Sequence, residues 1–307
     1  MEMMLQCFLL AAGFLMLVKG SDLFVDGSSG IAGKFGIPQL VIGLTIVAMG
    51  TSAPEAAVSI TAAIKGTSDI TIGNIVGSNI LNILMILGCS AVIVPIAVKD
   101  STIRFEIPFM IAITLLLYAL GMDGVISVID GMILWGVFLI YLLYLLFMAK
   151  RGEQEKFMIE DQPWWKLLFS MIAGLILIIV GSSISVDAAT LIAGTLGLSE
   201  KFIGLTIVAL GTSLPELFTS VSAARKGNAD IAIGNIVGSN IFNILFVIGT
   251  SALVTPVLFQ KAFQFDVFVA VFAAVLLWIC CRKDNRIGRT AGILMLASYA
   301  VYFVWIA

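Results

Sequence analysis

The chain has 307 residues, of which 60% are hydrophobic and 12% are charged, and its mean hydropathy is +1.12. Soluble chains are about a quarter charged, so most of this surface must face something other than water. Seventeen Lys and Arg against nineteen Asp and Glu exclude an electrostatic nucleic-acid-binding protein. The sequence contains no histidine, which excludes HExxH-type hydrolases, and its four cysteines have no metal-ligand spacing. We therefore expect an integral membrane protein.

A helix that crosses a bilayer needs about 20 apolar residues, and ten stretches meet that requirement. They lie near residues 3–20, 38–64, 70–97, 105–121, 126–149, 164–185, 200–224, 231–256, 263–281 and 289–306. The first and sixth are expected to continue as glycine-bearing extensions through 21–35 and 182–196. The chain begins with Met1 and Glu2 and lacks a basic segment before its first apolar run, so no cleavable signal peptide is expected.

The loops between the predicted spans differ in positive charge. With the N-terminus outside, the cytoplasmic loops hold 13 Lys and Arg, and the opposite loops hold three. The positive-inside rule then predicts that both termini lie outside and that the polar connection 150–163 lies in the cytoplasm. That connection is also the predicted boundary between two halves, residues 1–150 and 164–307, with 151–163 as the linker.

The two halves repeat one another at a constant offset of 161 residues. Residues 43–55 read GLTIVAMGTSAPE and residues 204–216 read GLTIVALGTSLPE, while GNIVGSNI occurs at both 73–80 and 234–241. Between 42–84 and 203–245, 31 of 43 positions are identical, and they include polar residues that hydrocarbon disfavours. Packing alone would tolerate exchange among apolar residues, so a merely structural duplication explains the pattern poorly. Since each half holds five spans, the second half is inverted in the membrane, which is typical of transporters.

The first motif places a carboxylate inside an apolar span in each half. Glu55 and Glu216 have no basic neighbour within two helical turns, so a bound cation or a proton is the expected counter-charge. Pro54 and Pro215 interrupt the helix hydrogen bonds and are expected to free carbonyls at 48–50 and 209–211. The neighbouring hydroxyls lie on the glutamate face of each helix: Thr51, Ser52, Thr212 and Ser213. The sequence thus predicts an all-oxygen site that suits hard cations such as Ca²⁺ and Na⁺.

The second motif supplies the helices that face the glutamates. It carries small residues that allow close helix packing, and polar side chains at intervals of four: Asn74, Ser78 and Asn82 in one half, and Asn235, Ser239 and Asn243 in the other. Two interpretations remain open here: these groups either hold helices together by hydrogen bonds or contribute to the ion site. The aspartates Asp22, Asp26 and Asp187 are interpreted as a solvated face.

GTSAPE and GTSLPE, each followed at one interval by GNIVGSN within a duplicated five-helix unit, resemble the two α-repeats of the cation/Ca²⁺ exchanger superfamily. The prokaryotic Na⁺/Ca²⁺ exchanger branch is the most similar. The resemblance implies an all-α integral membrane protein of ten transmembrane helices, arranged as two inverted five-helix repeats around four cation subsites. It also implies that the long first and sixth helices slide across the core.

The same resemblance implies a role for each motif residue. Glu55 and Glu216 would be shared ligands of Ca²⁺ and Na⁺, while Thr51, Ser52, Thr212 and Ser213 would contribute hydroxyl or carbonyl oxygens. Ala48 and Ala209 would contribute carbonyls, Ser78 and Ser239 would complete the sodium sites, and Asn82 and Asn243 would occupy central polar positions. Some members carry Asp where this chain has Asn243. Because Asn cannot ionise, the site of this chain has at most two formal negative charges, and the Asn argues against K⁺ dependence.

The resulting prediction is a secondary active antiporter that exchanges Na⁺ for Ca²⁺, with H⁺/Ca²⁺ exchange on the same scaffold as the alternative. A passive channel fits the inverted repeat less well, and an intramembrane enzyme lacks the residues it would need. We expect a multi-pass protein of a prokaryotic plasma membrane, with the bilayer and the transported ions as its partners. We expect no cofactor, no nucleic acid and no obligate protein partner.

Overall fold

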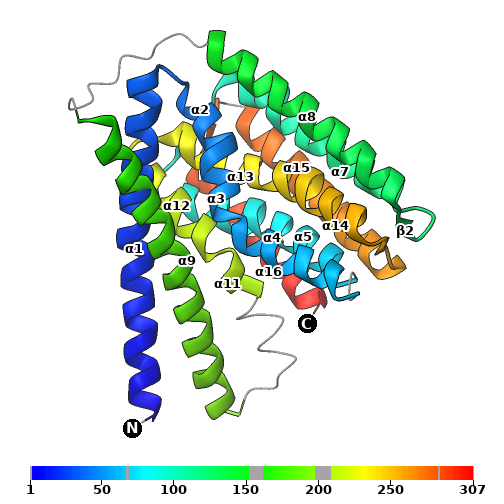
Figure 1. Cartoon of the computed structure of the whole chain (residues 1–307), viewed down its shortest axis with the longest axis horizontal. Coiled ribbons are helices and arrows are strands. Elements are labelled where there is room, and N and C mark those ends of the chain that lie inside the picture. Colours follow the sequence, from blue (N-terminus) through cyan, green and yellow to red (C-terminus); the bar gives the residue numbers. More distant parts are fainter. Residues whose placement is uncertain (1, 67–68, 152–161, 198–208, 283, 307) are drawn as a thin grey trace.

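The computed structural model describes residues 2–66, 69–151, 162–197, 209–282 and 284–306, and nearly all of them are helical (Figure 1). The first half contains α1 (Glu2–Phe35), α2 (Gln39–Ile42), η1 (Gly43–Val47), α3 (Ala48–Thr51), α4 (Ala53–Ile64), α5 (Asp69–Leu81), η2 (Asn82–Leu87), α6 (Gly88–Ile93), η3 (Thr102–Glu106), α7 (Ile107–Leu120) and α8 (Val128–Arg151). The second half contains α9 (Trp164–Thr195), α11 (Ala209–Thr212), α12 (Leu214–Arg225), α13 (Ala229–Phe242), η5 (Asn243–Ile248), α14 (Gly249–Val254), α15 (Lys261–Arg282) and α16 (Arg289–Ile306).

The described helices include seven that are long and apolar enough to cross a membrane, or eight if one bent pair counts as a single span. The bent pair is 39–51 with 53–64, and α16 is a shorter apolar helix. The predicted span 200–224 lies partly outside the described residues, which resume at α11, and so does most of the predicted linker 151–163. The predicted extensions of the first and sixth spans are confirmed, because α1 and α9 each continue without interruption.

Two antiparallel pairs of very short strands depart from the all-α prediction. Strand β1 (Ile96–Ala97) pairs with β4 (Arg286–Ile287), and β2 (Val125–Ile126) pairs with β3 (Val257–Leu258). Each pair joins a loop of the first half to a loop of the second. The predicted third span, 70–97, therefore ends at Ile93, and the chain becomes extended before Pro95. Proline disfavours a helical conformation in the residue before it, which explains this early end.

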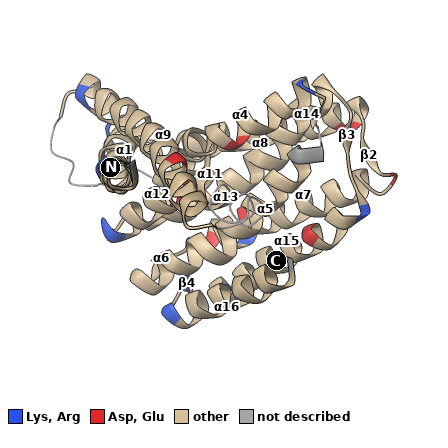
Figure 2. Ribbon diagram, turned by 90° about the horizontal axis from the view of Figure 1, so that it is seen from below, with Lys and Arg blue, Asp and Glu red and all other residues tan. Residues whose placement is uncertain are grey.

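The core lies where the span 71–93 of the first half packs near the span 229–254 of the second half. In the most apolar stretch of the 229–254 span 94% of the residues are buried, whereas α1 buries only 17% of the equivalent stretch. Many large apolar side chains of α1, α8, α9 and α16 are exposed, including Phe8, Ile140, Phe169 and Val304. Charged residues are sparse along the ribbon (Figure 2). An exposed apolar belt of this extent is expected of a protein surrounded by lipid.

Helices α1 and α9 pack against each other along their length and form a pair at one side of the molecule (Figure 1). Glycines permit the close approach: a Cβ on Gly20 would lie 2.9 Å from the carbonyl oxygen of Gly174, and one on Gly13 would lie 2.8 Å from that of Gly181. Small residues at such crossings are typical of tight packing between membrane helices. We call these two helices the α1–α9 pair.

Candidate functional site

Both glutamates lie at helix breaks in the interior. The first turn of α4 carries Glu55, and Ser52 separates α3 from α4 with φ −83° and ψ 9°, at a bend of 52°. In the second half Glu216 lies in the first turn of α12, and Ser213 interrupts the helix with φ −95° and ψ 6°. Each break lies two residues before a proline, which lacks an amide donor and whose ring clashes with the preceding turn. The sequence motif thus places one carboxylate beside each break.

The two breaks are hydrogen-bonded to each other crosswise. The Ser52 hydroxyl donates to Glu216 Oε1 at 2.8 Å, and the Ser213 hydroxyl donates to Glu55 Oε1 at 3.2 Å. All four residues are at most 1% exposed. Each carboxylate is therefore oriented by a hydroxyl from the opposite half, and the predicted association of the two motifs in space is confirmed.

Four buried oxygens of this region accept no hydrogen bond from the described residues: Glu55 Oε2, Glu216 Oε2, Asn82 Oδ1 and Asn243 Oδ1. An unpartnered buried carboxylate oxygen is costly, because the group has lost water and gained nothing in exchange. Among the described residues no group of three or more His, Cys, Asp or Glu side chains is placed to hold a metal ion. A hard cation bound among these oxygens would neutralise the negative charge of the two carboxylates.

The facing asparagines form a second crosswise set. Asn82 Nδ2 donates to Asn240 Oδ1 at 3.0 Å, and Asn243 Nδ2 donates to Asn79 Oδ1 at 3.1 Å. The amides of Asn79 and Asn240 each donate to the other residue's backbone carbonyl, at 3.2 and 3.1 Å. Because the amide nitrogens of Asn82 and Asn243 donate to the side-chain oxygens of Asn240 and Asn79, the free oxygens of Asn82 and Asn243 are fixed in direction.

The π-helical segments η2 and η5 begin at Asn82 and Asn243. Turns of this kind are rare and occur frequently at functional sites. Segment η2 packs against α12, which carries Glu216, and η5 packs against α4, which carries Glu55. The fold therefore brings the asparagine of each half against the glutamate helix of the other half.

The remaining predicted residues lie around this centre. Thr51 is buried, and its hydroxyl lies 3.2 Å from the Ala48 carbonyl oxygen and 3.0 Å from Asn235 Oδ1. Ser239 also donates to the Ala48 carbonyl, at 3.4 Å. The other two are Ser78, which is buried on α5, and Thr212, which is half-buried at the end of α11.

The expectation that proline frees the carbonyl of residue 48 is wrong. The amide of Ser52 donates to the Ala48 oxygen at 3.0 Å, because Pro54 disrupts the turn that reaches back to Gly50. In the second half the amide of Ser213 donates to the Leu210 oxygen at 3.2 Å instead. Ala209 begins α11 directly after residues that the structure does not describe.

The structure separates the two interpretations of the remaining motif asparagines. Asn74 Nδ2 donates to Ser59 at 2.9 Å, and Asn235 Nδ2 donates to Ser220 at 2.9 Å. Each amide also lies 3.4 Å from the backbone carbonyl of the neighbouring glutamate. These contacts hold the glutamate helices in place, which favours the helix-joining interpretation for Asn74 and Asn235.

Three buried polar residues were absent from the sequence-based site. Asn79 and Asn240 could have been found, since both belong to the unchanged motif GNIVGSN. Glu106 is a third buried intramembrane carboxylate, held by the hydroxyl of Tyr144 on α8 rather than by the central residues. The same rule that singled out Glu55 applies to Glu106, because it too interrupts an apolar run.

The whole chain matches known proteins. Residues 5–147 and 166–307 match the family described as sodium/calcium exchanger protein. The chain belongs to the sodium/calcium exchanger family. It is therefore a multi-pass membrane transporter of the exchanger type rather than an enzyme, and the family's cargo is ions, without a cofactor.

Two curated relatives and one solved structure illustrate this membership in the exchanger family. The inner membrane protein YrbG of Escherichia coli is 35% identical over 99% of this chain and 97% of its own length. The sodium/calcium exchanger MaX1 of Methanosarcina acetivorans is 32% identical, with 96% and 97% covered. The solved sodium-calcium exchanger NCX_Mj, soaked with Na⁺, has a TM-score of 0.85 and 36% identity, with 98% and 99% covered. The resemblance to the exchanger superfamily is thereby confirmed at the level of the family.

Proposed function

We propose that this protein is a secondary active antiporter that extrudes Ca²⁺ in exchange for Na⁺ across a prokaryotic plasma membrane, by alternating access. The observation that carries the proposal is the pair of buried glutamates, each oriented by a serine of the opposite half and each left with one unpartnered oxygen. Ca²⁺ and Na⁺ would compete for the same two carboxylates. One ion must leave before the other binds, and that competition couples the two fluxes.

The proposed ion ligands are the motif residues around this centre. Glu55 and Glu216 bind both ions, and the hydroxyl or carbonyl oxygens of Thr51, Ser52, Thr212 and Ser213 complete the coordination. Ala48 and Ala209 contribute carbonyl oxygens, Ser78 and Ser239 contribute to the sodium sites, and Asn82 and Asn243 supply central amide oxygens. The oxygens of the two asparagines support this assignment, since both are buried and neither accepts a hydrogen bond from the described residues.

We further propose ten spans in two inverted halves, residues 1–150 and 164–307, joined by 151–163. The strand pairs support this topology. Two loops that pair must lie on the same side of the membrane, so an even number of spans must separate them. Six spans lie between β1 and β4 and four between β2 and β3, provided that the predicted span 200–224 crosses the membrane. The positive-inside rule then places both termini outside and the linker in the cytoplasm.

Charge sets the electrical behaviour of the exchange. Two carboxylates neutralise one Ca²⁺, whereas three or more Na⁺ would leave the site positive, so exchange of that stoichiometry moves net charge. H⁺/Ca²⁺ exchange remains the alternative, with the same glutamates cycling between protonated and Ca²⁺-bound forms.

The test is ⁴⁵Ca²⁺ uptake into proteoliposomes that are loaded with Na⁺ and diluted into Na⁺-free buffer, beside a matched pH-gradient arm. We expect uptake driven by the Na⁺ gradient. With three Na⁺ leaving for each Ca²⁺, the interior becomes negative, so K⁺ with valinomycin should accelerate uptake. Uptake driven only by the pH gradient would transfer the coupling role to protons, and Ca²⁺ flux without any counter-ion would contradict antiport.

A further inference from the structure

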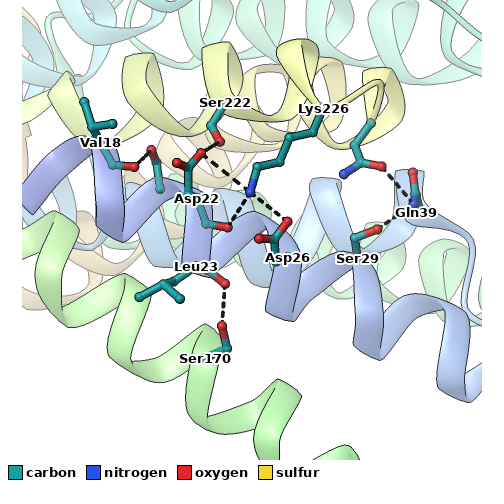
Figure 3. A network of polar contacts seen from close by, with 11 residues as sticks. Val18, Asp22, Leu23, Asp26, Ser29, Gln39, Ser170, Ser222 and Lys226 are labelled. Carbon is teal, nitrogen blue, oxygen red and sulfur yellow. Dashed lines mark hydrogen bonds and ion pairs between the residues drawn. The ribbon is translucent and has the colours of Figure 1, made fainter. Parts of the chain in front are cut away.

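A charged network fastens the C-terminal half of α1 to the end of α12 (Figure 3). Lys226 Nζ lies 2.7 Å from Asp26 Oδ1 and 3.5 Å from Asp22 Oδ1, and it donates to the Asp22 backbone carbonyl at 2.9 Å. The hydroxyl of Ser222 donates to Asp22 Oδ1 at 2.7 Å. The aspartates belong to α1, whereas Lys226 and Ser222 belong to the α12 side, so these contacts tie a helix of the α1–α9 pair to the core. The solvated-face interpretation of Asp22 and Asp26 therefore misses their partner.

The internal repeat carries a second copy of three of these four groups, because the counterpart of Asp22 is Ser183. The offset of 161 residues relates Asp26 to Asp187 and Lys226 to Lys65. It also relates Ser222 to Thr61, which retains the hydroxyl. The second copy places its acid on α9 and its lysine directly after α4. Each half therefore contributes an aspartate from its long helix and a lysine from its glutamate helix.

The two copies are in different states in this structure. Lys65 and Asp187 are both exposed, and among the described residues neither side chain makes a hydrogen bond or an ion pair. The surrounding packing differs in the same sense, because α1 lies along α12, whereas α9 makes its core contacts to α3, α11 and α12. One copy is engaged and the other is open.

The α1–α9 pair is tightly packed, so the movement of one helix that the proposed alternating access requires would carry the other helix with it. The glycine contacts bring the two backbones too close for one helix to shift far without the other. A displacement that separates Asp26 from Lys226 therefore also moves Asp187 relative to Lys65. In an inverted repeat, the second conformation gives each half the contacts that the other half makes in the first.

We infer that the two lysine–aspartate sets are alternative latches of the α1–α9 pair. Lys226 with Asp22 and Asp26 holds the pair in one transport position, Lys65 with Asp187 holds it in the other, and the two latches do not close together. The inference rests on the proposed alternating access and names the contacts that hold its two end states. The latches act on the position of the pair and do not touch the transported ion.

The latch that is closed here can open at small cost. Lys226 is 28% exposed and Asp26 is 62% exposed. A cleft of about 330 Å³ between α1 and α12 is lined by Asp22, Arg225 and Lys226 and gives these charges access to water. Ion pairs that can be rehydrated are weak and reversible, as a contact broken in every cycle must be.

Cross-linking tests the inference directly. In a variant whose four cysteines are replaced, one pair of new cysteines is introduced as Asp26→Cys with Lys226→Cys, and another as Asp187→Cys with Lys65→Cys. A short bifunctional thiol reagent with a reducible bridge should link each pair, each link should stop ⁴⁵Ca²⁺ flux, and reductant should restore it. In a variant with both pairs, mass spectrometry should find either link in a molecule but not both.

Two results would overturn the inference: a 65–187 pair that never links in a background that transports, or both links together in one molecule. Since mass spectrometry reads the links without reference to flux, the latches are judged separately from the coupling ion. If the cysteine-free background transported no Ca²⁺ with a Na⁺ gradient and none with a pH gradient, that result would instead contradict the proposed function.

Removing the lysine charge of one latch provides an independent test, because it should favour closure of the other latch. Lys226→Gln should speed linking of the 65–187 pair about 3- to 5-fold, and Lys65→Gln should speed linking of the 26–226 pair by a similar factor. Lys261→Gln, an exposed lysine at the start of α15, should change neither rate. Unchanged rates in both lysine variants, or slower linking in either, would contradict the alternative latches.

Discussion

Replacing Glu216 by glutamine should separate two effects of the same carboxylate. In the ion-free protein Glu216 is fully buried and shares the centre with Glu55, so removing its charge should not lower thermal stability. In the Ca²⁺-bound protein the loss is large. Two unit charges 4 Å apart interact by about 4 kcal/mol at an effective dielectric constant of about 20, so a divalent ion gains about 8 kcal/mol from one carboxylate.

Desolvation of the carboxylate cancels part of that gain. If about half remains, Ca²⁺ affinity falls by about 4 kcal/mol, or about 1,000-fold in Kd. The assay is ⁴⁵Ca²⁺ equilibrium binding to purified Glu216→Gln, with thermal unfolding measured on the same ion-free sample. We expect binding and exchange to be lost in a protein that unfolds no earlier than the parent.

The matched control for this variant is Glu106→Gln. It makes the same chemical change at another buried intramembrane carboxylate, one held by Tyr144 and not by the central residues. It should leave Ca²⁺ affinity within a few-fold of the parent. A Glu216→Gln variant that binds Ca²⁺ as well as Glu106→Gln does would refute the assignment of the central carboxylates.

Three further predictions concern the centre and the α1–α9 pair. Ser52→Ala and Ser213→Ala should each slow exchange about 10-fold, since a hydrogen bond to a charged group is worth about 1.5–3 kcal/mol; parental rates in both would show that the crosswise bonds do not orient the carboxylates. When ionised, the third acid of Asn243→Asp leaves a site loaded with three Na⁺ neutral and a Ca²⁺-loaded site with one negative charge, so the membrane potential should act on the Ca²⁺ step instead of the Na⁺ step; Ca²⁺/Ca²⁺ exchange whose rate stays independent of voltage would count against its place at the site. Gly20→Val should lower the unfolding temperature, because its Cβ would meet Gly174 at 2.9 Å, while Gly136→Val, where no atom lies within 4 Å, should not.

The repeat in the sequence predicted the central arrangement well, for a physical reason. A carboxylate in hydrocarbon is so unfavourable that its presence in two identical motifs implies a common polar centre, and the structure brings Glu55 and Glu216 together. The long continuous helices α1 and α9 were also predictable, from apolar runs that continue into glycine-bearing segments.

Other features depend on contacts that no local pattern encodes. The hydrogen bonds between Asn79 and Asn240 join residues 161 positions apart, and sequence alone does not say which of several motif asparagines face each other. The partners of Asp22 and Asp26 lie 200 residues further along the chain, so composition suggested only a solvated surface. The carbonyl of Ala48 keeps its amide partner because the disruption by proline falls two residues later, a detail of turn geometry.

The crosswise hydrogen bonds have a consequence for how the protein is divided. Since Ser52 orients Glu216 and Ser213 orients Glu55, neither half contains a complete set of interactions, and the β1–β4 and β2–β3 pairs join the halves a second time at their loops. The peptide connection is then dispensable for the architecture. Two separately translated fragments, 1–150 and 164–307, should assemble in one membrane into a single transport unit, whereas either fragment alone should be inactive.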